Sequence, residues 1–573
     1  MKTVTRSILF AAAFGMIAIA QPAVTGALNT ASYIVPGLPN AGLAQGGMIA
    51  IFGRNIGPAA IAQANSFPLP TDLGGTSAKI TVAGQSSDLV MVYSISTQVG
   101  AIVPSNTPTG SGTITVTYNG QTSAPLAVTV VASQLGIFTI NQGGSGPAVV
   151  QNVNSEADRP VNTILNSARP GQAMILWGTG LGPIAGSDRG APPVGDLNQA
   201  IEVLVAGRRA NVLYKGRSGC CAGIDQIVFE VPGGVQGCYV PLVVKNGNSV
   251  SNYTSIAVAP TGGTCSDPFG YTSSELNTAN ATGKLSVGSV SLSRVNAKIS
   301  ALGVTLDQTT EIGSGSFVSY DGAQLVASRG TSGTAVTVGA CTLFTINGTS
   351  GSPVDPVQPR VLDAGNTINV TGPNGNKQIT KGQGGLYSAT LGSSTGVGGG
   401  LPGLPGGLPG GLPGGIPGLP GGGSGSYLTA GAYSTNNGTG GVDVGGFTSN
   451  LTIPGNFSWT NEAATTSVNR ASDLTVTWTG AGANDYVFIN GISFDQTARV
   501  GASFVCLERG SASRLVVPSA IMLGMPASSV VQGVPTGFLG VGVTGEPSRF
   551  TARGLDVGVF TYQSTTQKTM SFQ

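Results

Sequence analysis

The side chains that could perform chemistry in this chain are carboxylates, hydroxyls and cysteines, because the sequence contains no histidine. Without histidine, serine–histidine and cysteine–histidine catalysis and every histidine-ligated metal site are excluded. A serine nucleophile would need a lysine base instead, and the sequence has no Ser-x-x-Lys dyad. The remaining catalytic alternative is a pair of acidic side chains, which is the pair that glycosidases use.

The acid pairs that are close in sequence do not form such a dyad. Asp225 and Glu230 are five positions apart, which places them on opposite faces of a strand. Asp485 and Asp495 flank Asn490-Gly491, a dipeptide that predicts a hairpin turn, and the register of that hairpin does not pair the two acids. We therefore predict that the protein is not an enzyme. The alternative is a carbohydrate-active enzyme whose Asp/Glu pair is assembled by the fold of the C-terminal domain.

A short basic segment is the one candidate ligand patch. It contains Arg208, Arg209, Tyr214, Lys215 and Arg217. One interpretation is a small site for an acidic polysaccharide or a surface phosphate. The other is an edge strand that carries charge as a protection against aggregation.

The sequence contains no cofactor or metal motif. Gly178-Thr179-Gly180-Leu181-Gly182 resembles half of a dinucleotide-binding loop, but it lacks the final glycine and the following helix, so it predicts a tight turn. The Asp-x-Asp-x-Asp-Gly pattern of a calcium loop does not occur. We expect no cofactor, and calcium held by scattered loop carboxylates stays open as an alternative.

The six cysteines predict three disulfides in an exported chain. A zinc site built from four cysteines would require C-x2-C-like spacing, which is missing. The expected pairs are Cys341–Cys506, and Cys220 and Cys221 each with one of Cys238 and Cys265, in an order that the sequence leaves open.

The N-terminus has the features of a secretory signal peptide over residues 1–20. Lys2 and Arg6 precede an apolar stretch from Ile8 to Ala20, which ends in the small residues of a cleavage site. No later segment has 18 uninterrupted apolar residues, so no membrane span is expected after cleavage. The predicted location is the extracellular space or the cell surface, with the periplasm as the alternative.

Composition narrows the class of protein further. The chain has 573 residues with 26 Lys+Arg and 24 Asp+Glu, and a net charge of +2 provides no electrostatic footprint for nucleic acid. Charged residues make up 9% of the chain, against about 25% in ordinary soluble domains. With 91 glycines and 40% hydrophobic residues, the composition predicts a weakly charged all-β protein.

An internal repeat divides the first half of the chain. The segment Gly47–Gly53 returns as Gln172–Gly178, and Val82-Ala83-Gly84 returns as Val205-Ala206-Gly207. Two further anchors keep the same order, so we predict two copies of one domain, at residues 21–132 and 133–260.

Each copy has the pattern of an Ig-like β-sandwich. Ile, Val and Tyr alternate with Thr along Thr113–Tyr118, Asn119-Gly120 provides a hairpin turn, and Leu126–Val130 can return as the partner strand. We expect the second copy to turn in the same way at Asn246-Gly247. Short strands with turns between them in about 110 residues are typical of Ig-like sandwiches. No segment shows a helical period.

A linker at 261–283 is predicted to lead into a larger β-sandwich-type C-terminal domain at 284–573. A Leu-Pro-Gly-rich tract at 393–426 interrupts this domain. If Cys341 pairs with Cys506, the tract lies inside the closed loop and is an insertion at a hairpin tip. Trp177, Trp459 and Trp478 occur in alternating apolar strands, which favours core packing over sugar stacking.

Both repeats resemble a family of exported proteins, common in acidobacteria, that carry an uncharacterised domain related to the IPT/TIG group of Ig-like folds. The resemblance rests on Asn29–Tyr33, Gly178–Gly182, Asp225-Gln226-Ile227 through Pro232, and Gly237–Pro241. In that family Asn more often follows the Asp-Gln-Ile run, where this chain has Val228. The resemblance implies an extracellular Ig-like module and transfers no catalytic or ligand residues.

The sequence therefore predicts a secreted or cell-surface protein with a binding or structural role. We expect recognition of glycans or of cell-surface and matrix proteins through the loops at the ends of the sandwiches, because such loops carry recognition while strands hold them. The two alternatives are the carbohydrate-active enzyme and a purely structural spacer. The sequence leaves the oligomeric state open.

Overall fold

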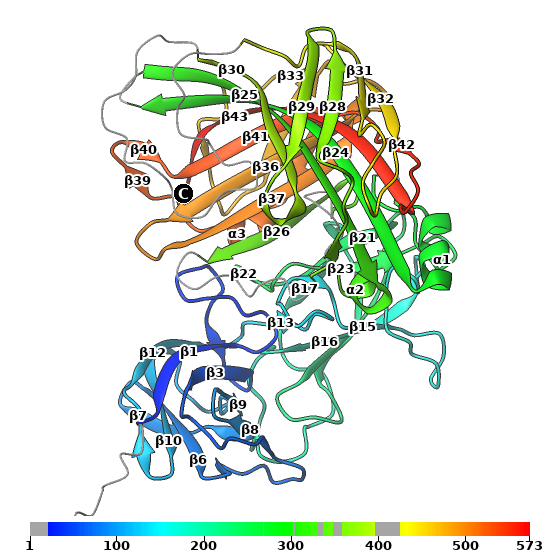
Figure 1. Ribbon diagram of the computed structural model, residues 1–573. Helices are drawn as coiled ribbons and strands as arrows, with labels where there is room; N and C mark the ends of the chain where they lie inside the picture. The colour runs from blue at the N-terminus through cyan, green and yellow to red at the C-terminus, as the bar shows by residue number, and fades with distance from the viewer. Residues whose placement is uncertain are drawn as a thin grey trace, which may run out of the picture.

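The computed structural model describes residues 21–267, 269–301, 304–328, 336–347, 358–395, 425–455 and 457–573 (Figure 1). The predicted signal peptide lies outside the described residues, as do residues 396–424 of the predicted Leu-Pro-Gly insertion. Nearly all of the regular secondary structure in the described chain is β-strand, which confirms the all-β fold class. Two sandwiches occupy one side of the molecule and a larger β region the other (Figure 1).

Residues 23–131 form the first sandwich, called repeat 1 below. Alternate residues of its strands, such as Ile114 and Val116, are fully buried between the two sheets, while Thr113 and Thr115 face outward. One sheet has the order β1 (Ala23–Asn29), β3 (Met48–Arg54), β9 (Gln98–Ile102), β8 (Val90–Ile95) and β4 (Ala62–Gln63). The other has the order β2 (Leu43–Ala44), β12 (Leu126–Val131), β10 (Gly110–Tyr118), β6 (Thr76–Val82) and β5 (Asp72–Leu73), with β11 (Gln121–Thr122) on β10 and β7 (Gln85–Asp88) on β6.

Residues 136–258 form the second sandwich, called repeat 2 below, with a similar strand arrangement. Its first sheet has the order β13 (Gly136–Ile137), β16 (Ala173–Thr179), β20 (Asp225–Glu230) and β19 (Asn211–Arg217), with β15 (Val150–Asn152) on β16. Its second sheet has the order β14 (Gly146–Pro147), β23 (Thr254–Val258), β21 (Gly237–Asn246), β17 (Ile201–Val205) and β18 (Arg208–Arg209), with β22 (Ser249–Val250) on β21.

The repeated turns are alike at one anchor and differ at another. Ala83-Gly84 and Ala206-Gly207 both have positive φ at each residue, as a type I′ turn requires. Asn119-Gly120 forms the predicted turn between β10 and β11. The predicted turn at Asn246-Gly247 is wrong by one residue, because Asn246 still pairs with Ser249 and the turn is formed by residues 247 and 248.

The C-terminal region contains one sheet of 15 described strands. Its order is β26 (Ala340–Asn347), β37 (Val500–Arg509), β36 (Tyr486–Asp495), β41 (Gly537–Thr544), β43 (Val557–Phe572), β24 (Lys284–Ala301), β25 (Val304–Asp321), β30 (Tyr387–Thr395), β29 (Gly375–Lys381), β28 (Thr367–Gly372), β31 (Gly431–Asn436) and β32 (Thr448–Ile453), with β27 (Arg360–Val361) on β25 and β34 (Ser467–Val468) and β42 (Ser548–Phe550) on β43. Smaller sheets are β33 (Ser458–Trp459), β35 (Leu474–Thr479) and β38 (Arg514–Val517), and the hairpin of β39 (Val530–Val531) and β40 (Val534–Pro535).

This long sheet encloses two hydrophobic cores. It curls until β32 lies against β42, where the hydroxyls of Ser449 and Ser548 are 3.3 Å apart. Phe560 of β43 belongs to the core inside this curl, whereas Phe572 at the end of the same strand belongs to the other core. The C-terminal region is therefore two packed lobes that share β43.

The tryptophans are placed largely as predicted. Trp459 and Trp478 lie opposite each other on β33 and β35 and are 5% and 1% exposed, within one of the C-terminal cores. Trp177 is half-buried, and its indole N–H donates to the Gln151 side chain at 3.0 Å. The described structure therefore assigns Trp459 and Trp478 to core packing rather than to a sugar platform.

The predicted hairpin at Asn490-Gly491 is wrong. β36 runs unbroken through both residues and pairs along its length with β37 and β41. Glycine is required at 491 because the Phe504 ring of the neighbouring strand occupies the position of a Cβ. Asp485 and Asp495 thus lie near opposite ends of a ten-residue strand, about 30 Å apart at the usual rise per residue.

Three short α-helices interrupt the β-structure of the described residues, although the sequence shows no helical period. The helices are α1 (Ser273–Thr282), α2 (Gly322–Ala327) and α3 (Ser519–Gly524), and the 3-10 turns are η1 (Gln383–Gly385) and η2 (Gly510–Ala512). Helix α1 lies in the segment predicted as a linker. It begins with a capping box between Thr272 and Glu275 and ends at Gly283 with φ +71°. The capping residues at its two ends therefore identify the helix better than the weakly amphipathic pattern of its interior does.

Repeat 1 is tied to repeat 2 by buried side chains. The Asn29 amide donates to the carbonyls of Gln134 and Thr179, both at 3.2 Å. The Thr179 hydroxyl accepts from the Met48 N–H at 2.7 Å. The glycine run predicted as a tight turn lies in this junction, and Gly180 (φ +97°) lets the backbone approach the Gln134 carbonyl.

A buried ion pair completes the junction. The Arg217 guanidinium contacts the Asp225 carboxylate, and it also donates to the carbonyls of Gly46 in repeat 1 at 3.0 Å and Gly182 at 2.6 Å. Asp225 in turn accepts from the Leu181 N–H at 2.7 Å. Several of the residues that carry the family resemblance therefore lie where the two repeats meet.

Repeat 2 also packs directly on the C-terminal region. Leu204 and Val243 from its outer face join the C-terminal core that contains Trp478. The disulfide between Cys238 and Cys265 lies in a further core shared with α1. In the part of the chain that the structure describes, no helix has the length and apolar character needed to cross a membrane.

Candidate functional site

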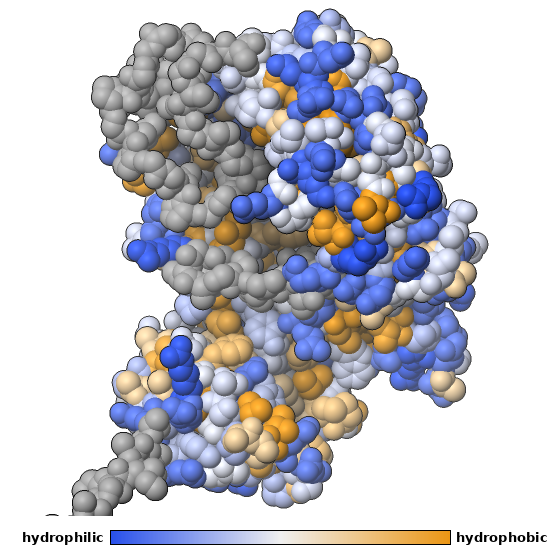
Figure 2. Space-filling model, in the orientation of Figure 1, coloured by the Kyte–Doolittle hydropathy of each residue, from blue (hydrophilic) through white to orange (hydrophobic). Residues whose placement is uncertain are grey.

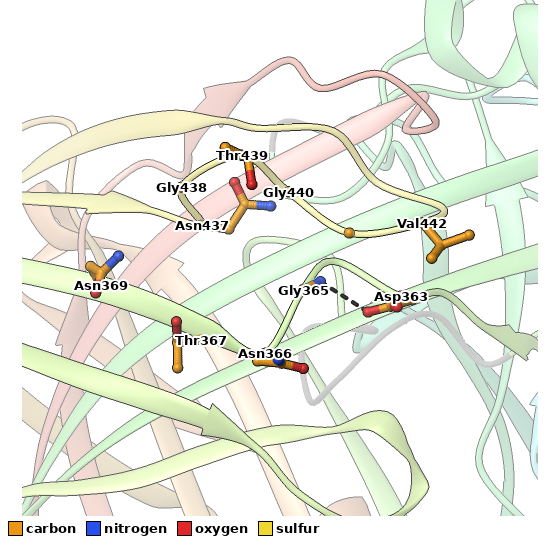
Figure 3. Close-up of a pocket in the computed structure, with 11 residues that line it drawn as sticks. Asp363, Gly365, Asn366, Thr367, Asn369, Asn437, Gly438, Thr439, Gly440 and Val442 are labelled. Carbon is orange, nitrogen blue, oxygen red and sulfur yellow. Dashed lines mark hydrogen bonds between the residues drawn. The ribbon is translucent and has the colours of Figure 1, made fainter.

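A polar groove opens in the C-terminal region, between the loop that precedes β28 and the loop that joins β31 to β32 (Figure 3). Its volume is about 630 Å³. The groove is lined by amide and hydroxyl side chains, glycine backbone, one carboxylate and one valine, from Asp363, Gly365, Asn366, Thr367, Asn369, Asn437, Gly438, Thr439, Gly440, Gly441 and Val442.

One residue of strand β28 leaves its backbone groups open toward the groove. The Asn366 carbonyl accepts from the Lys381 N–H at 3.0 Å and so faces β29. Backbone groups alternate in direction along a strand, so those of Thr367 and Asn369 face the side of β31. The ladder with β31 extends only as far as Asn369, which pairs with Asn436. The N–H and C=O of Thr367 therefore have no paired strand and face the groove.

The two loops are held together by buried polar contacts. Asn437 is buried, and its amide donates to the carbonyls of Ala364 at 3.0 Å and Gly445 at 3.1 Å. The Tyr387 hydroxyl donates to the Gly365 carbonyl at 2.6 Å. Contacts of this kind form the groove before a ligand arrives, which lowers the entropic cost of binding.

Two neighbouring carboxylates at the end of the groove are each paired with a base. Asp363 Oδ1 lies 2.7 Å from Lys381 Nζ, and Asp443 Oδ1 lies 3.2 Å from Arg360 Nη1. Asp443 also accepts from the Asp363 N–H at 2.8 Å. We call these four side chains the clasp. The hydrogen bond from Lys381 lowers the pKa of Asp363, and that from the Asp363 N–H lowers the pKa of Asp443.

The clasp does not have the properties of a glycosidase pair. Such a pair needs one acid whose pKa is raised, so that it carries a proton near neutral pH. The pKa values of Asp363 and Asp443 are both lowered, so both are ionised and neither can donate a proton. Their role in this geometry is to fix the loops.

The groups left for a ligand are neutral. Among the described residues, the side chains of Asn366, Thr367 and Thr439 make no hydrogen bond. Figure 3 shows these three around the groove, with Val442, which is 80% exposed, at its end. Amide and hydroxyl groups donate and accept hydrogen bonds without charge, so they fit an uncharged, hydroxyl-bearing ligand.

Recognition by loops is predicted from the sequence, but the local sequence does not locate this groove. The available signal was Asn437 followed by four small or polar residues ending at Gly441, which predicts a loop whose backbone can approach another chain closely. The partner loop around Gly365 comes from about 70 residues earlier, and nothing in the local sequence links the two.

Acidification should loosen the clasp. Because the folded-state pKa values of Asp363 and Asp443 are lowered, their contribution to stability is present above the unfolded pKa of about 3.9 and is lost as the pH falls through the folded values. We expect the amide of Gly365, which donates to Asp363, to lose hydrogen-exchange protection in that window. The Phe447 amide, held by uncharged Asn437, is the internal reference. Equal behaviour of both amides would contradict the prediction.

The predicted basic patch is not a single surface. Arg217 does not belong to a surface patch, so this part of the prediction is wrong. Its side chain is 1% exposed and forms the buried ion pair at the junction of the two repeats. The guanidinium faces inward because Asp225 and two carbonyls provide its partners there. The Tyr214 hydroxyl donates to the Arg217 carbonyl at 2.8 Å.

The other basic residues of the patch have separate partners. Arg209 is exposed and lies 3.0 Å from the Glu202 carboxylate, while Arg208 donates to the Gly233 carbonyl at 3.2 Å. Lys215 donates to the Gln199 carbonyl. Arg208 and Arg209 lie on the short edge strand β18, which fits the alternative of a charged, protected edge.

The disulfides differ from the prediction at the vicinal pair. Cys220 and Cys221 lie in the loop between β19 and β20, whereas Cys238 lies in β21 of the opposite sheet within a separate core, so neither can reach it. The observed pairs are Cys220–Cys221, Cys238–Cys265 and Cys341–Cys506. The last is the expected one, and it joins directly opposed residues of β26 and β37.

Glu311 is a buried carboxylate that is not among the site residues predicted from the sequence. It accepts from the N–H groups of Tyr427 at 2.5 Å and Leu428 at 3.0 Å, and from the Ser426 hydroxyl at 2.7 Å. The Arg294 Nε is 3.7 Å away. Glu311 thus fixes the chain where it re-enters the sheet after the Leu-Pro-Gly tract, and its oxygens are occupied by these contacts.

The insertion leaves and re-enters the sheet at one place. Ser393 near the end of β30 forms a bridge with Gly425, so residues near the two ends of the predicted 393–426 tract lie side by side. Among the described residues, no cluster of three or more Asp, Glu, Cys or His side chains is placed to hold a metal ion.

Comparisons with known proteins identify no family. No family model and no curated protein matches the chain. Similar solved structures include domains 4–9 of the surface layer protein SbsC (8% identity, 94% of this chain, 83% of that one, TM-score 0.16) and a gamma-CGTase from Alkalophilic bacillus clarkii (12% identity, 48% of this chain, 34% of that one, TM-score 0.14). Immunoglobulin domains 1–4 of Sidekick-1 match at 10% identity over 96% of this chain and 99% of that one, with a TM-score of 0.11. At these TM-scores the similarity indicates no function.

Proposed function

We propose that this protein is an exported, non-catalytic protein of the cell surface or extracellular matrix that binds neutral glycans through its C-terminal groove. One observation carries the proposal: the groups of the groove that are free to bind are uncharged. Asn366, Thr367 and Thr439 offer amide and hydroxyl groups, and the backbone of Thr367 adds a donor and an acceptor.

The disulfides support export. Three bridges among six cysteines are typical of proteins that fold in an oxidising compartment. The signal peptide predicted at residues 1–20 agrees with this location. Together they favour the cell surface or matrix over the cytosol.

The groove argues against a charged partner. An acidic polysaccharide would need free basic groups, but Lys381 and Arg360 are engaged by Asp363 and Asp443. The hydroxyl groups of a neutral glycan, by contrast, can replace the water that hydrogen-bonds to Thr367 and Thr439. The groove has no aromatic ring among its lining residues, so we expect weak, hydrogen-bonded recognition that benefits from a polymeric ligand.

Substitution in the groove tests the proposal. The double variant Asn366→Ala, Thr439→Val removes an amide and a hydroxyl while keeping the shape of residue 439. If each loses a hydrogen bond worth about 1 kcal/mol, affinity for neutral polysaccharides should fall by about tenfold or more. Thr371→Val, on strand β28 but outside the groove lining, is the matched control and should bind as the unmodified protein does. Equal affinity of the double variant and the control would contradict the proposal.

A further inference from the structure

The vicinal disulfide Cys220–Cys221 is the most accessible of the three bridges. Both of its cysteines are exposed. The other four cysteines are buried, with exposed fractions from 0% to 8%. Of the three bridges, this one is therefore the easiest for a reagent in solution to approach while the protein stays folded.

The loop that carries this disulfide is also a contact between the two repeats. The Gly223 carbonyl accepts from the Thr179 hydroxyl at 2.5 Å, and that same hydroxyl accepts from the Met48 N–H of repeat 1. Ala222 packs against a cluster of repeat 1 that includes Leu69 and Ile102. The conformation of residues 218–224 therefore affects the contacts that hold repeat 1 against repeat 2.

Besides the disulfide, hydrogen bonds within residues 218–224 maintain the shape of the loop. The Ser218 hydroxyl donates to the Cys221 carbonyl at 3.1 Å and accepts from the Cys221 N–H at 3.3 Å. The Ser218 N–H donates to the Ile224 carbonyl at 2.9 Å, and the Ile224 N–H donates to the Cys221 carbonyl at 3.3 Å. The disulfide adds the one covalent restraint between side chains of this loop, at its exposed end.

We propose that Cys220–Cys221 is a thiol-exchange site, and that its reduction by a small dithiol loosens repeat 1 from repeat 2. One thiolate of the dithiol attacks an exposed Sγ, which breaks the Sγ–Sγ bond and forms a mixed disulfide. The second thiol of the reagent displaces the protein sulfur and closes to a cyclic disulfide. Two electrons and two protons pass to the protein, which ends with thiols at Cys220 and Cys221.

Loss of the restraint acts on the junction through Gly223. With two free side chains, residues 220–222 can leave their conformation, and the Gly223 carbonyl is then no longer held against the Thr179 hydroxyl. The Met48 N–H bond to that hydroxyl opens more often as a result. The buried Arg217–Asp225 pair remains, so the repeats loosen without unfolding.

The accessibility of the site is tested by counting thiols. Folded protein is treated with increasing dithiothreitol, alkylated with iodoacetamide and mapped by mass spectrometry. The expected result is alkylation of Cys220 and Cys221 alone over a range of dithiol concentrations, with the other four labelled only after unfolding. Labelling of Cys238, Cys265, Cys341 or Cys506 at the same or lower concentrations, or no labelling of the folded protein, would overturn the proposal.

The effect on the junction is tested by hydrogen exchange. Reduction and alkylation should lower the protection of the Met48 amide by about tenfold, with Ile51 in the core of repeat 1 unchanged as the reference for global unfolding. The variant Cys220→Ser, Cys221→Ser should show the low protection without dithiol and no further response to it. Unchanged Met48 protection in the reduced protein, or an equal response to dithiol in the variant, would contradict the coupling. Neither result depends on glycan binding by the groove.

Discussion

Replacing Arg217 by methionine should lower the free energy of unfolding of the two repeats by about 3–5 kcal/mol. The substitution leaves the Asp225 carboxylate, which is 0% exposed, without its counter-charge, and an unpaired buried charge is far more costly than the pair itself is favourable. It also removes the donors to the carbonyls of Gly46 and Gly182, which link repeat 1 to repeat 2. Urea denaturation followed by hydrogen exchange of the β20 amides measures the loss.

A matched arginine is the control for this prediction. Arg209 also forms an ion pair, with Glu202, but its side chain is 76% exposed. Arg209→Met should therefore cost less than about 1 kcal/mol. The double variant Arg217→Met, Asp225→Leu should recover much of the loss, because it removes the unpaired charge. A cost for Arg217→Met no larger than that for Arg209→Met would contradict the assignment of the junction.

Replacing Glu311 by alanine should destabilise the C-terminal region by about 3 kcal/mol. The N–H groups of Tyr427 and Leu428 lose their acceptor, and each unsatisfied buried donor costs about 1–3 kcal/mol. Arg294 also loses the nearby carboxylate. We expect the amides of residues 427 and 428 to lose exchange protection first, since Glu311 holds the chain at that point.

Glu508 provides the comparison for Glu311. Its carboxylate is half-buried and accepts from the N–H of the adjacent Arg509 at 2.8 Å. Glu508→Ala should cost less than about 1 kcal/mol, and Glu311→Gln, which keeps one acceptor oxygen, should lie between the two alanine variants. If Glu311→Ala unfolds no more easily than Glu508→Ala, the carboxylate does not fix the re-entry of the chain.

Local pattern predicts strands such as β10 and the turn that both repeats share. The alternation along Thr113–Tyr118 is a period-2 signal that burial of one sheet face imposes directly. The same turn at Ala83-Gly84 and Ala206-Gly207 requires positive φ, so it stays recognisable in both copies. Such features depend on neighbours in the chain and are visible in one sequence.

Features that depend on distant partners could not be predicted in this way. Asn490-Gly491 has the composition of a turn, but Phe504 on the next strand requires the glycine within a strand instead. Arg217 looks like a surface base, and only the folded junction shows that Asp225 and Gly46 surround it. The space-filling view shows polar and apolar residues interspersed over the visible face (Figure 2). The pattern of this face therefore indicates neither the glycine within β36 nor the buried Arg217.

The candidate groove could not be located for the same reason. Asn437 and Gly365 belong to loops about 70 residues apart, and their contact follows from the pairing of β28 with β31. The vicinal disulfide was likewise hidden, because the sequence does not show that Cys238 lies on the opposite sheet.

The most direct test of the account mixes the mature protein with insoluble neutral polysaccharides and cell envelopes, and scores retention and sugar release in the same tubes. We expect retention without release, and a loss of retention in the variant Asn366→Ala, Thr439→Val. Release of sugar would contradict the non-catalytic assignment and direct the search to the acids of the C-terminal region. Retention that the groove variant does not change would contradict the groove as the binding site, and no retention at all would favour a structural spacer.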